Sequence, residues 1–470
     1  MEARKTEAVA HRVRRFPAAP RATTGRPFRS IVNRAGMRSS GRARGVNITR
    51  AGTRALTLMK KPVQTLSHCL RARLLPHTLL TLLAVFAPPV ARGAPPEPSP
   101  YAFYERFIAI DAACAWPSLH ALPNGDLVVL IWPQDSHGKT SGAVESWISR
   151  DHGVKWRRAG VPVPIEPGLI RVNVGAGVVA GSLIALVGGF TNRPPYEEGA
   201  RFWSKERTAE ITRNSTSLEV GVAVSRDSGV TWSQYPDPGF GRGPVTGRHF
   251  IPYGRVGELT DRMIGVMLYG IYGDGAHFWV SGDDGKSWKR RGTLAGPDAA
   301  TVRGSHYNET TWLRLENGDL YAAARSFTSE EFVGGQSLDG FRSTDSGITW
   351  VREKALALPN QIPADLTRMA DGRLLLTYSS RNPGSRAIWI RFGSADARSW
   401  SQPYLLVDLE GSMESQHSPP QTDGGYPSTV LAADGTYVTA YYSRGVPAHQ
   451  RYHMGVIRWR LRGTTATPLN

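Results

Sequence analysis

The sequence predicts an all-β fold, a six-bladed β-propeller of four-stranded antiparallel blades, and two interleaved repeats predict it. The first repeat is the turn motif Ser-x-Asp-x-Gly-x-x-Trp, and the second is a hairpin closed by an Asn-Gly or Asp-Gly turn. The composition agrees with this class. With 50 Gly and 33 Pro in 470 residues, the chain suits short strands joined by tight turns better than long helices.

The turn motif occurs in four complete copies and one degenerate copy. Its aspartates are 76, 56, 62 and 51 residues apart, which is the length of one four-stranded blade. Its Asp and Ser can bond amides of their own turn, its Gly permits a positive φ, and its Trp packs beneath the hairpin. We therefore assign the motif a structural role only. The copies are Ser149-Asp151-Gly153-Trp156, Ser225-Asp227-Gly229-Trp232, Ser281-Asp283-Gly285-Trp288, Ser343-Asp345-Gly347-Trp350, and SADARSW from Ser394 to Trp400.

The hairpin repeat supplies the two inner strands of each blade. The pattern gives six hairpins and five turn motifs, so the last blade lacks a motif. We expect the strand around Tyr101 to Ile110 to complete that blade and to join the two ends of the chain. The hairpin turns are Asn124-Gly125, Asn317-Gly318, Asp371-Gly372 and Asp434-Gly435, with weaker versions near Ala180-Gly181 and Asp261.

The net charge of +18 lies almost entirely in the first fifth of the chain. Residues 1–94 contain 19 Lys and Arg against two acids, which leaves the remainder close to neutral. Because nucleic-acid affinity rests on clustered cations, nucleic acid is not an expected partner.

The N-terminal segment is typical of an exported protein. Residues 74–87 form an apolar run that follows two arginines and is too short for a membrane span. We interpret residues 1–58 as a basic extension that precedes a translation start at Met59, 59–93 as a signal peptide, and 94–470 as the propeller. The expected location is secreted or periplasmic, without stable membrane insertion after cleavage, and a transit peptide is the competing interpretation.

The turn motif is the Asp-box, also called the BNR repeat, and residues 100–462 resemble the sialidase (neuraminidase) superfamily of glycoside hydrolases. The resemblance implies a Tyr nucleophile activated by a Glu, an Asp acid/base, and three Arg that clamp the substrate carboxylate. It implies no metal or organic cofactor. A phenol suits an anionic sugar because it does not bring a full negative charge to it beforehand.

Three residues match the family pattern through the hairpins. Glu309 lies sixteen residues before Arg325, as in the family. Glu309 and Tyr426 each lie eight residues before their hairpin turn, so both should begin an innermost strand and face the central axis. The alternative interpretations are a structural Glu309–Arg325 ion pair and a core aromatic at Tyr426.

Other family residues are matched less directly. Arg386 lies eight residues before its Asp-box, as the family's third Arg does, and is otherwise a solvated loop cation. Asp135 is the carboxylate in the loop where the acid/base should lie, and His137 could share that role. The family's first Arg is absent, because Ala115-Trp116-Pro117 stands in its place. Its possible substitutes are Arg171, Arg255 and Arg303.

The first two Asp-boxes are separated by an insertion that could be a lid carrying Phe202 and Trp203, or a tolerated surface loop. Asn214 and Asn308 lie in glycosylation-type sequons. The expected function is a secreted exo-acting hydrolase of a terminal acidic sugar such as sialic acid, with a glycan as its partner and a monomeric state. The alternatives are a related glycosidase for another sugar, a noncatalytic carbohydrate-binding propeller, and a structural or protein-binding propeller.

Overall fold

The computed structural model describes residues 101–138, 140–191, 216–270, 274–295, 305–328, 337–381, 386–409, 423–444, 449 and 451–462. All of them belong to one compact unit, Ala91–Asn470. Their named elements are strands, which confirms the all-β class. In this part of the chain no helix is long and apolar enough to cross a membrane. The extension and signal peptide expected at 1–93 lie outside the described residues.

Four of the sheets contain four antiparallel strands each. Three of these four run in chain order: β2 (Cys114–Ala121), β3 (Leu127–Trp132), β4 (Glu145–Ser149) and β5 (Arg157–Gly160); β15 (Ser305–Arg314), β16 (Leu320–Thr328), β17 (Ser337–Ser343) and β18 (Val351–Ala355); β19 (Gln361–Arg368), β20 (Leu374–Ser380), β21 (Ala387–Gly393) and β22 (Tyr404–Asp408).

The fourth of these sheets joins the two ends of the described chain. Its order is β1 (Tyr101–Asp111), β25 (His453–Leu461), β24 (Tyr437–Arg444) and β23 (Asp423–Leu431). The pairing of β1 with β25 confirms the closing strand predicted around Tyr101 to Ile110.

The fifth sheet has nine strands and consists of two antiparallel groups joined edge to edge. One group is β6 (Leu169–Val179), β7 (Ser182–Thr191), β9 (Gly221–Ser225) and β10 (Ser233–Tyr235), with β8 (Thr216–Ser217) beside β7; the other is β11 (Ile251–Glu258), β12 (Ile264–Tyr269), β13 (Ala276–Ser281) and β14 (Lys289–Ala295). The join is a parallel pairing of β6 with β11 at two residue pairs, Gly175 with Gly254 and Ala176 with Arg255.

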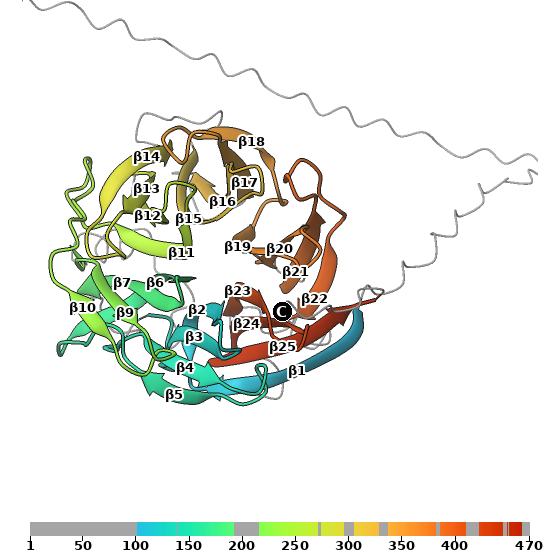
Figure 1. The fold of residues 1–470 in the computed structure, drawn as a ribbon. Helices are drawn as coiled ribbons and strands as arrows, with labels where there is room; N and C mark the ends of the chain where they lie inside the picture. The colour runs from blue at the N-terminus through green and yellow to red at the C-terminus, as the bar shows by residue number, and fades with distance from the viewer. Residues whose placement is uncertain are drawn as a thin grey trace, which may run out of the picture. The chain divides into compact units, whose positions relative to one another are not determined.

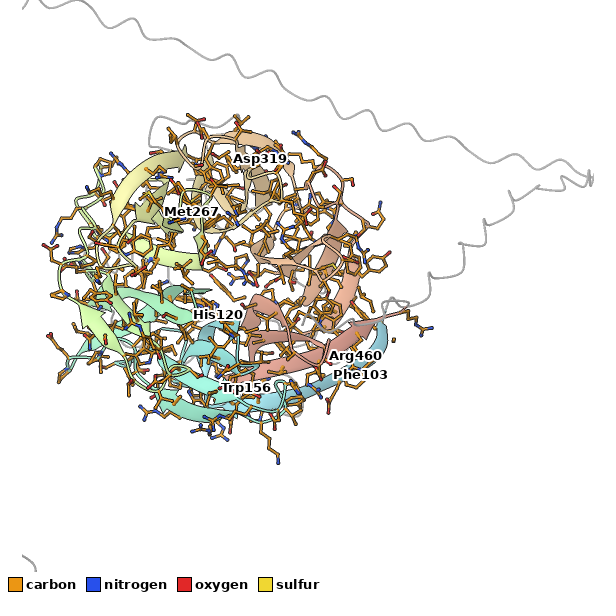
Figure 2. All side chains as sticks on the ribbon, in the orientation of Figure 1. Phe103, His120, Trp156, Met267, Asp319 and Arg460 are labelled. Carbon is orange, nitrogen blue, oxygen red and sulfur yellow. The ribbon has the colours of Figure 1, made fainter. Side chains whose placement is uncertain are left out.

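The sheets stand around a common centre, as Figure 1 shows. Strands β2, β6, β11, β15, β19 and β23 lie innermost; each contacts the next, and β23 contacts β2. His120 of β2 lies close to this centre, whereas Trp156 and Phe103 lie near the rim (Figure 2). The ring of inner strands therefore surrounds an axis onto which their side chains project.

The Asp-boxes connect the third and fourth strands of their sheets. In the first box Ser149 Oγ donates to Asp151 Oδ1 (2.8 Å), Gly153 N donates to Ser149 Oγ (2.9 Å), and Trp156 Nε1 donates to Gly153 O (2.9 Å). The same three contacts recur in the next three boxes. These self-contained networks give the motif the structural role expected from its sequence.

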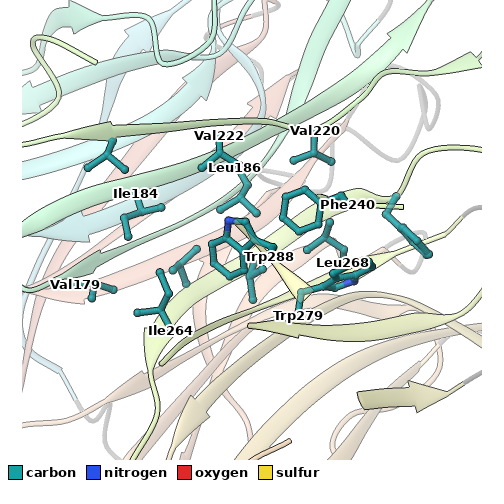
Figure 3. Close-up of a cluster of buried hydrophobic side chains, with 14 residues drawn as sticks. Val179, Ile184, Leu186, Val220, Val222, Phe240, Ile264, Leu268, Trp279 and Trp288 are labelled. Carbon is teal, nitrogen blue, oxygen red and sulfur yellow. The ribbon is translucent and has the colours of Figure 1, made fainter. Parts of the chain in front are cut away.

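The apolar cores lie between neighbouring groups of strands, including the two groups of the nine-stranded sheet. Figure 3 shows one of them, where Trp288 of the third box packs among residues of β6 to β13. Its indole stacks on Phe240, with ring centroids 5.8 Å apart. Each box tryptophan thus links a local turn to the packing of a whole sheet.

Replacing an Asp-box glycine with alanine should destabilise the fold strongly. Gly347 has a φ of +90°, and a Cβ there would lie 2.3 Å from Cδ1 of Phe278, a buried ring packed against Trp312 and Trp350. We expect Gly347→Ala to lower the free energy of unfolding by about 3 kcal/mol, from backbone strain and overpacking together. Urea unfolding measures the change.

The matched control is Gly181→Ala in the β6–β7 turn. Gly181 also has a positive φ, +76°, but nothing lies within 4 Å of an added Cβ. We expect a loss of only about 1 kcal/mol, from backbone strain alone. Equal losses in the two variants would contradict the proposed packing of Phe278 against the box.

Candidate active site

Every innermost strand departs from regular pairing near its beginning. The register shifts lie between Cys114 and Ser118, Ile170 and Asn173, Tyr253 and Gly257, Tyr307 and Thr310, Gln361 and Ala364, and Gly425 and Ser428. A shift of this kind turns side chains out of the regular ladder. Glu309 and Tyr426 lie within two of these irregular segments, which is the equivalence predicted from their shared distance to the hairpin turn.

Tyr426, Glu309 and Arg325 form one buried cluster. Tyr426 Oη donates to Glu309 Oε1 at 2.6 Å. Arg325 Nη1 donates to Glu309 Oε2 at 2.5 Å and reaches Tyr426 Oη at 3.3 Å. The three side chains come from β23, β15 and β16, so the structure brings together three of the residues selected from the sequence.

The backbone around Tyr426 is held in an unusual conformation. Gly425 has a φ of 132° and Tyr426 a φ of 52°, which few residues other than glycine adopt. Tyr426 N donates to Ser379 Oγ at 2.9 Å, and a Cβ on Gly425 would lie 2.5 Å from that same oxygen. Strain of this kind is concentrated at functional sites, where surrounding contacts hold it in place.

Tyr426 is a neutral phenol in the resting site. Burial and the neighbouring Glu309 carboxylate raise its pKa well above the ordinary value for tyrosine, against the opposing effects of Arg325 and Arg381. The pKa of Arg325 is also raised, because Glu309 and Tyr426 outweigh the effect of burial. Tyr426 can therefore act as a nucleophile only if its proton passes to Glu309 during the reaction.

Arg381 is a residue of this site that the sequence reasoning missed. It directly follows β20, and its guanidinium carbon lies 5.2 Å from the centre of the Tyr426 ring. Its Nε and Nη2 atoms are buried and have no hydrogen-bond partner among the residues that the structure describes. Tyr426 and nearby acids raise its pKa although burial acts against this, so it stays a cation. Its position after β20 is not equivalent to that of Arg325, which lies within β16, so no spacing in the sequence identifies it.

Aromatic rings enclose Tyr426 on its other sides. Trp116, Tyr442 and Tyr253 lie with ring centroids 5.2, 5.9 and 6.2 Å from its own. Trp116 follows Ala115, whose φ of 48° marks the irregular start of β2. An indole thus stands beside Tyr426 in the segment where the family has its first Arg.

Arg255 belongs to a neighbouring axial cavity and has internal partners. Its Nε and Nη2 atoms donate to the two carboxylate oxygens of Asp365 at 3.0 and 2.8 Å, and Nη2 also donates to Thr429 O at 2.9 Å. The cavity, of about 30 Å³, is lined by both residues and by Tyr426 and has room for water but not for a sugar ring. This geometry favours a structural role for Arg255 over the substrate-binding role expected from the sequence.

Asp135, the predicted acid/base, lies in an exposed loop position. Its Oδ1 accepts a hydrogen bond from Tyr452 N at 2.8 Å. His137 in the same loop lies nearer the aromatic rings, and its Nδ1 is 2.8 Å from Oδ2 of Asp423. Asp423, at the start of β23, also accepts hydrogen bonds from Tyr442 and Tyr452 and was not selected from the sequence.

The remaining sequence candidates are placed as follows. Arg171 donates to the carbonyl of Glu219 at 3.1 Å, within its own sheet, so the geometry does not support it as a substitute for the first Arg. Arg386 is half-buried at the edge of β21, where its carbonyl accepts a hydrogen bond from Leu409, and its role as a substrate ligand stays a prediction. Asn308 borders Glu309 and accepts its backbone N–H at 2.7 Å. Arg303, Phe202, Trp203 and Asn214 lie outside the described residues.

Residues 210–439 match the family of the BNR repeat-like domain. No curated protein sequence matches the chain. A Dyadobacter fermentans DSM 18053 protein of unknown function is 19% identical in structural alignment, over 76% of this chain and 98% of its own, with a TM-score of 0.58. The Hadza microbial sialidase Hz136 is 16% identical over 75% of this chain and 66% of its own, with a TM-score of 0.52.

A further similar structure is the intramolecular trans-sialidase from Ruminococcus gnavus in complex with oseltamivir carboxylate. It is 14% identical over 77% of this chain and 98% of its own, with a TM-score of 0.51. Identities this low show a common fold and carry no statement about activity. With its Asp-box turns and antiparallel sheets, the described part of the chain has the fold of these similar structures, and its residues 210–439 are similar to the BNR repeat-like domain.

Proposed function

We propose that this protein is a retaining exo-glycosidase that removes a terminal acidic sugar, such as sialic acid, from a glycan. The observation that carries the proposal is the contact of Tyr426 with Glu309 and Arg325 beside the axis. Two side chains of the β15–β18 sheet, a carboxylate and a guanidinium, contact the phenolic oxygen of Tyr426 from another sheet, which is the arrangement that an activated tyrosine nucleophile requires.

In the proposed reaction, Tyr426 Oη attacks the anomeric carbon as the bond to the leaving oxygen breaks. The phenolic proton passes to Glu309 Oε1, which already accepts it in a hydrogen bond of 2.6 Å. Arg325 is then paired with a neutral carboxylic acid and offers its positive charge to the substrate. Water later attacks the covalent intermediate and gives one proton to the acid/base group that protonated the leaving oxygen, while Tyr426 takes its proton back from Glu309, so that two displacements retain the configuration.

The cations of the site support an acidic substrate. Arg325 and Arg381 both lie against Tyr426, and the sequence places Arg386 in the loop that follows Arg381. A guanidinium with buried donor atoms favours a planar anion such as a carboxylate, because charged hydrogen bonds strengthen away from water. Trp116 offers an apolar surface to the sugar ring in place of the first family Arg.

The proposal includes the architecture and the location inferred from the sequence. We interpret the five sheets as six blades, because the nine-stranded sheet divides at the β6–β11 pairing and the six inner strands contact one another in a closed cycle. The apolar segment at 74–87 supports export, and the location of the net charge in residues 1–94 supports the absence of a nucleic-acid partner; a monomeric state is part of the proposal.

The first experiment is an assay of the purified protein on fluorogenic sialosides and related uronosides. We expect fluorophore release from at least one of these acidic glycosides, with the sugar first released in the anomeric configuration of the substrate. Inversion seen by NMR would contradict the tyrosyl mechanism. Glycan-array binding without release of sugar would select the noncatalytic carbohydrate-binding alternative, which the missing first Arg favours.

Arg381→Gln should weaken recognition of the acidic sugar. Because a hydrogen bond to a charged group contributes about 1.5–3 kcal/mol, we expect kcat/KM to fall by roughly 10–100-fold, mainly through KM. Arg381→Lys should recover part of this loss by keeping the charge. The matched control is Arg368→Gln, which removes an arginine paired with the exposed Glu316 and should leave kcat/KM unchanged. Equal effects of the two Gln variants would contradict a substrate contact by Arg381.

A further inference from the structure

His137 and Asp423 form an oriented pair beside the tyrosine cluster. His137 Nδ1 lies 2.8 Å from Asp423 Oδ2. Tyr452 Oη donates to that oxygen at 2.9 Å, and Tyr442 Oη donates to Oδ1 at 3.1 Å, so both carboxylate oxygens are held. Since a carboxylate accepts, Nδ1 carries the proton, and Nε2 is the ring nitrogen left for other chemistry.

The His137 imidazole and the ring of Tyr426, the proposed nucleophile, contact the same two aromatic side chains. The imidazole meets Trp116 edge-on at 5.9 Å and Tyr442 at 5.8 Å, and both of those rings pack against Tyr426. The His137 side chain is 33% exposed, so a ligand can reach it. A retaining glycosidase needs its nucleophile and its acid/base as two separate groups, and the Trp116 and Tyr442 rings, which contact both His137 and Tyr426, hold the two apart.

The electrostatic surroundings keep Asp423 ionised. Although burial opposes ionisation, His137 and Arg381 hold the pKa of the Asp423 carboxyl well below its usual range. The other titratable or charged groups near the pair are Cys114, whose Sγ is 4.0 Å from Nδ1, and Asp135, Tyr442, Tyr452 and Arg444. A fixed carboxylate at Nδ1 also orients the imidazole ring, because it holds the Nδ1 side of the ring toward Asp423.

Asp135 has a different part in the same loop. Its carboxylate accepts the backbone N–H of Tyr452, the residue whose phenol bonds Asp423. Asp135 therefore holds the backbone of Tyr452, and the Tyr452 phenol in turn holds Asp423.

We propose that His137 is the catalytic acid and base of this site, with Asp423 as its positioning residue. The inference rests on the proposed glycosidase function and departs from the carboxylic acid that the family resemblance implies. In the first displacement, the proton on His137 Nε2 passes to the leaving oxygen while the Tyr426 proton passes to Glu309. In the second, a proton of the attacking water passes to His137 Nε2, and Glu309 returns its proton to Tyr426, so the site ends as it began.

The test compares His137→Ala with the wild-type protein on glycosides whose leaving groups differ in acidity. A proton donor matters most for a poor leaving group, so we expect kcat/KM to fall by about 10²–10³-fold on an alkyl glycoside and less than about 10-fold on a fluorinated aryl glycoside. With the fluorinated substrate, added azide should restore turnover and yield the glycosyl azide with retained configuration, because azide attacks the intermediate without a base. If His137 had a purely structural role, the alanine variant would lower kcat/KM equally on both glycosides, and azide would give no glycosyl azide.

Companion variants keep the test decisive. His137→Gln serves if the alanine variant fails to fold, and Asp423→Asn should show the same dependence on leaving group with a smaller loss. Ser136→Ala controls for disturbance of the loop and should leave both rates unchanged. The inference is overturned if the dependence and the azide rescue arise in Asp135→Asn and not at His137, while Tyr426→Phe remains inactive. Absence of turnover by the wild-type protein on every acidic glycoside overturns the proposed function together with this inference.

Discussion

Tyr426→Phe is expected to lower kcat on the accepted glycoside by at least ~10³-fold with little effect on folding. The substitution removes one oxygen, which is both the proposed nucleophile and the donor to Glu309. The ring and its contacts with Trp116, Tyr253 and Tyr442 remain, so the site keeps its shape. Steady-state kinetics and a thermal melt together separate the loss of chemistry from a loss of structure.

The matched control is Tyr321→Phe, which removes a buried phenolic oxygen from β16 in the core against β19 and β20. It should leave kcat and KM unchanged, because Tyr321 does not contact the Tyr426 cluster. Turnover by Tyr426→Phe equal to that of the wild type would remove the tyrosyl mechanism.

Glu309→Gln is the second variant with a large expected effect, on activity and stability together. The amide cannot take the proton of Tyr426, so we expect kcat to fall by about 10²–10⁴-fold. It also leaves the Arg325 cation buried without its counter-charge. Breaking a buried pair from one side costs about 3–5 kcal/mol, and since the amide keeps a hydrogen bond we expect the lower end of this range in urea unfolding.

The control for Glu309→Gln is Glu316→Gln, which is nearby in sequence and also paired with an arginine. The Glu316 side chain is 68% exposed, against 7% for Glu309. An exposed pair contributes at most about 1 kcal/mol, so this variant should keep both stability and kcat. If the Glu309→Gln protein were stable and fully active, the Glu309–Arg325 pair would contribute no more to stability than an exposed ion pair does. Glu309 would then not be the base that accepts the Tyr426 proton.

The fold could be predicted from the sequence because its turns are locally encoded. In the four complete Asp-boxes the hydrogen bonds of the motif join residues at most four apart, so the motif determines its local structure in each of them. The closing strand was predictable by counting, since one hairpin lacked a box. The β6–β11 pairing was not, because it depends on a close approach of two distant segments. A Cβ on Gly177 would lie 1.9 Å from Val256 O, a contact that no local pattern reveals.

The site was predictable as far as the hairpin repeat extends. Glu309 and Tyr426 occupy equivalent places in two hairpins, and the strand irregularities at those places turn both toward one point. Residues whose roles depend on distant partners were not predictable. Arg255 is hydrogen-bonded to Asp365, 110 positions away in the sequence. His137, in the loop after β3, pairs with Asp423 at the start of β23. Arg381 belongs to no sequence motif, and only its contact with the Tyr426 ring places it in the site.

The most direct test of a tyrosine nucleophile is to trap the covalent intermediate with a fluorinated acidic sugar bearing a fluoride leaving group. Ring fluorine slows hydrolysis of the intermediate more than its formation, so the glycosyl protein should accumulate. The account predicts a mass increase of one sugar, located by peptide mass spectrometry on Tyr426 and absent from Tyr426→Phe. Turnover of the sugar with no adduct, or an adduct on any other residue, would contradict it.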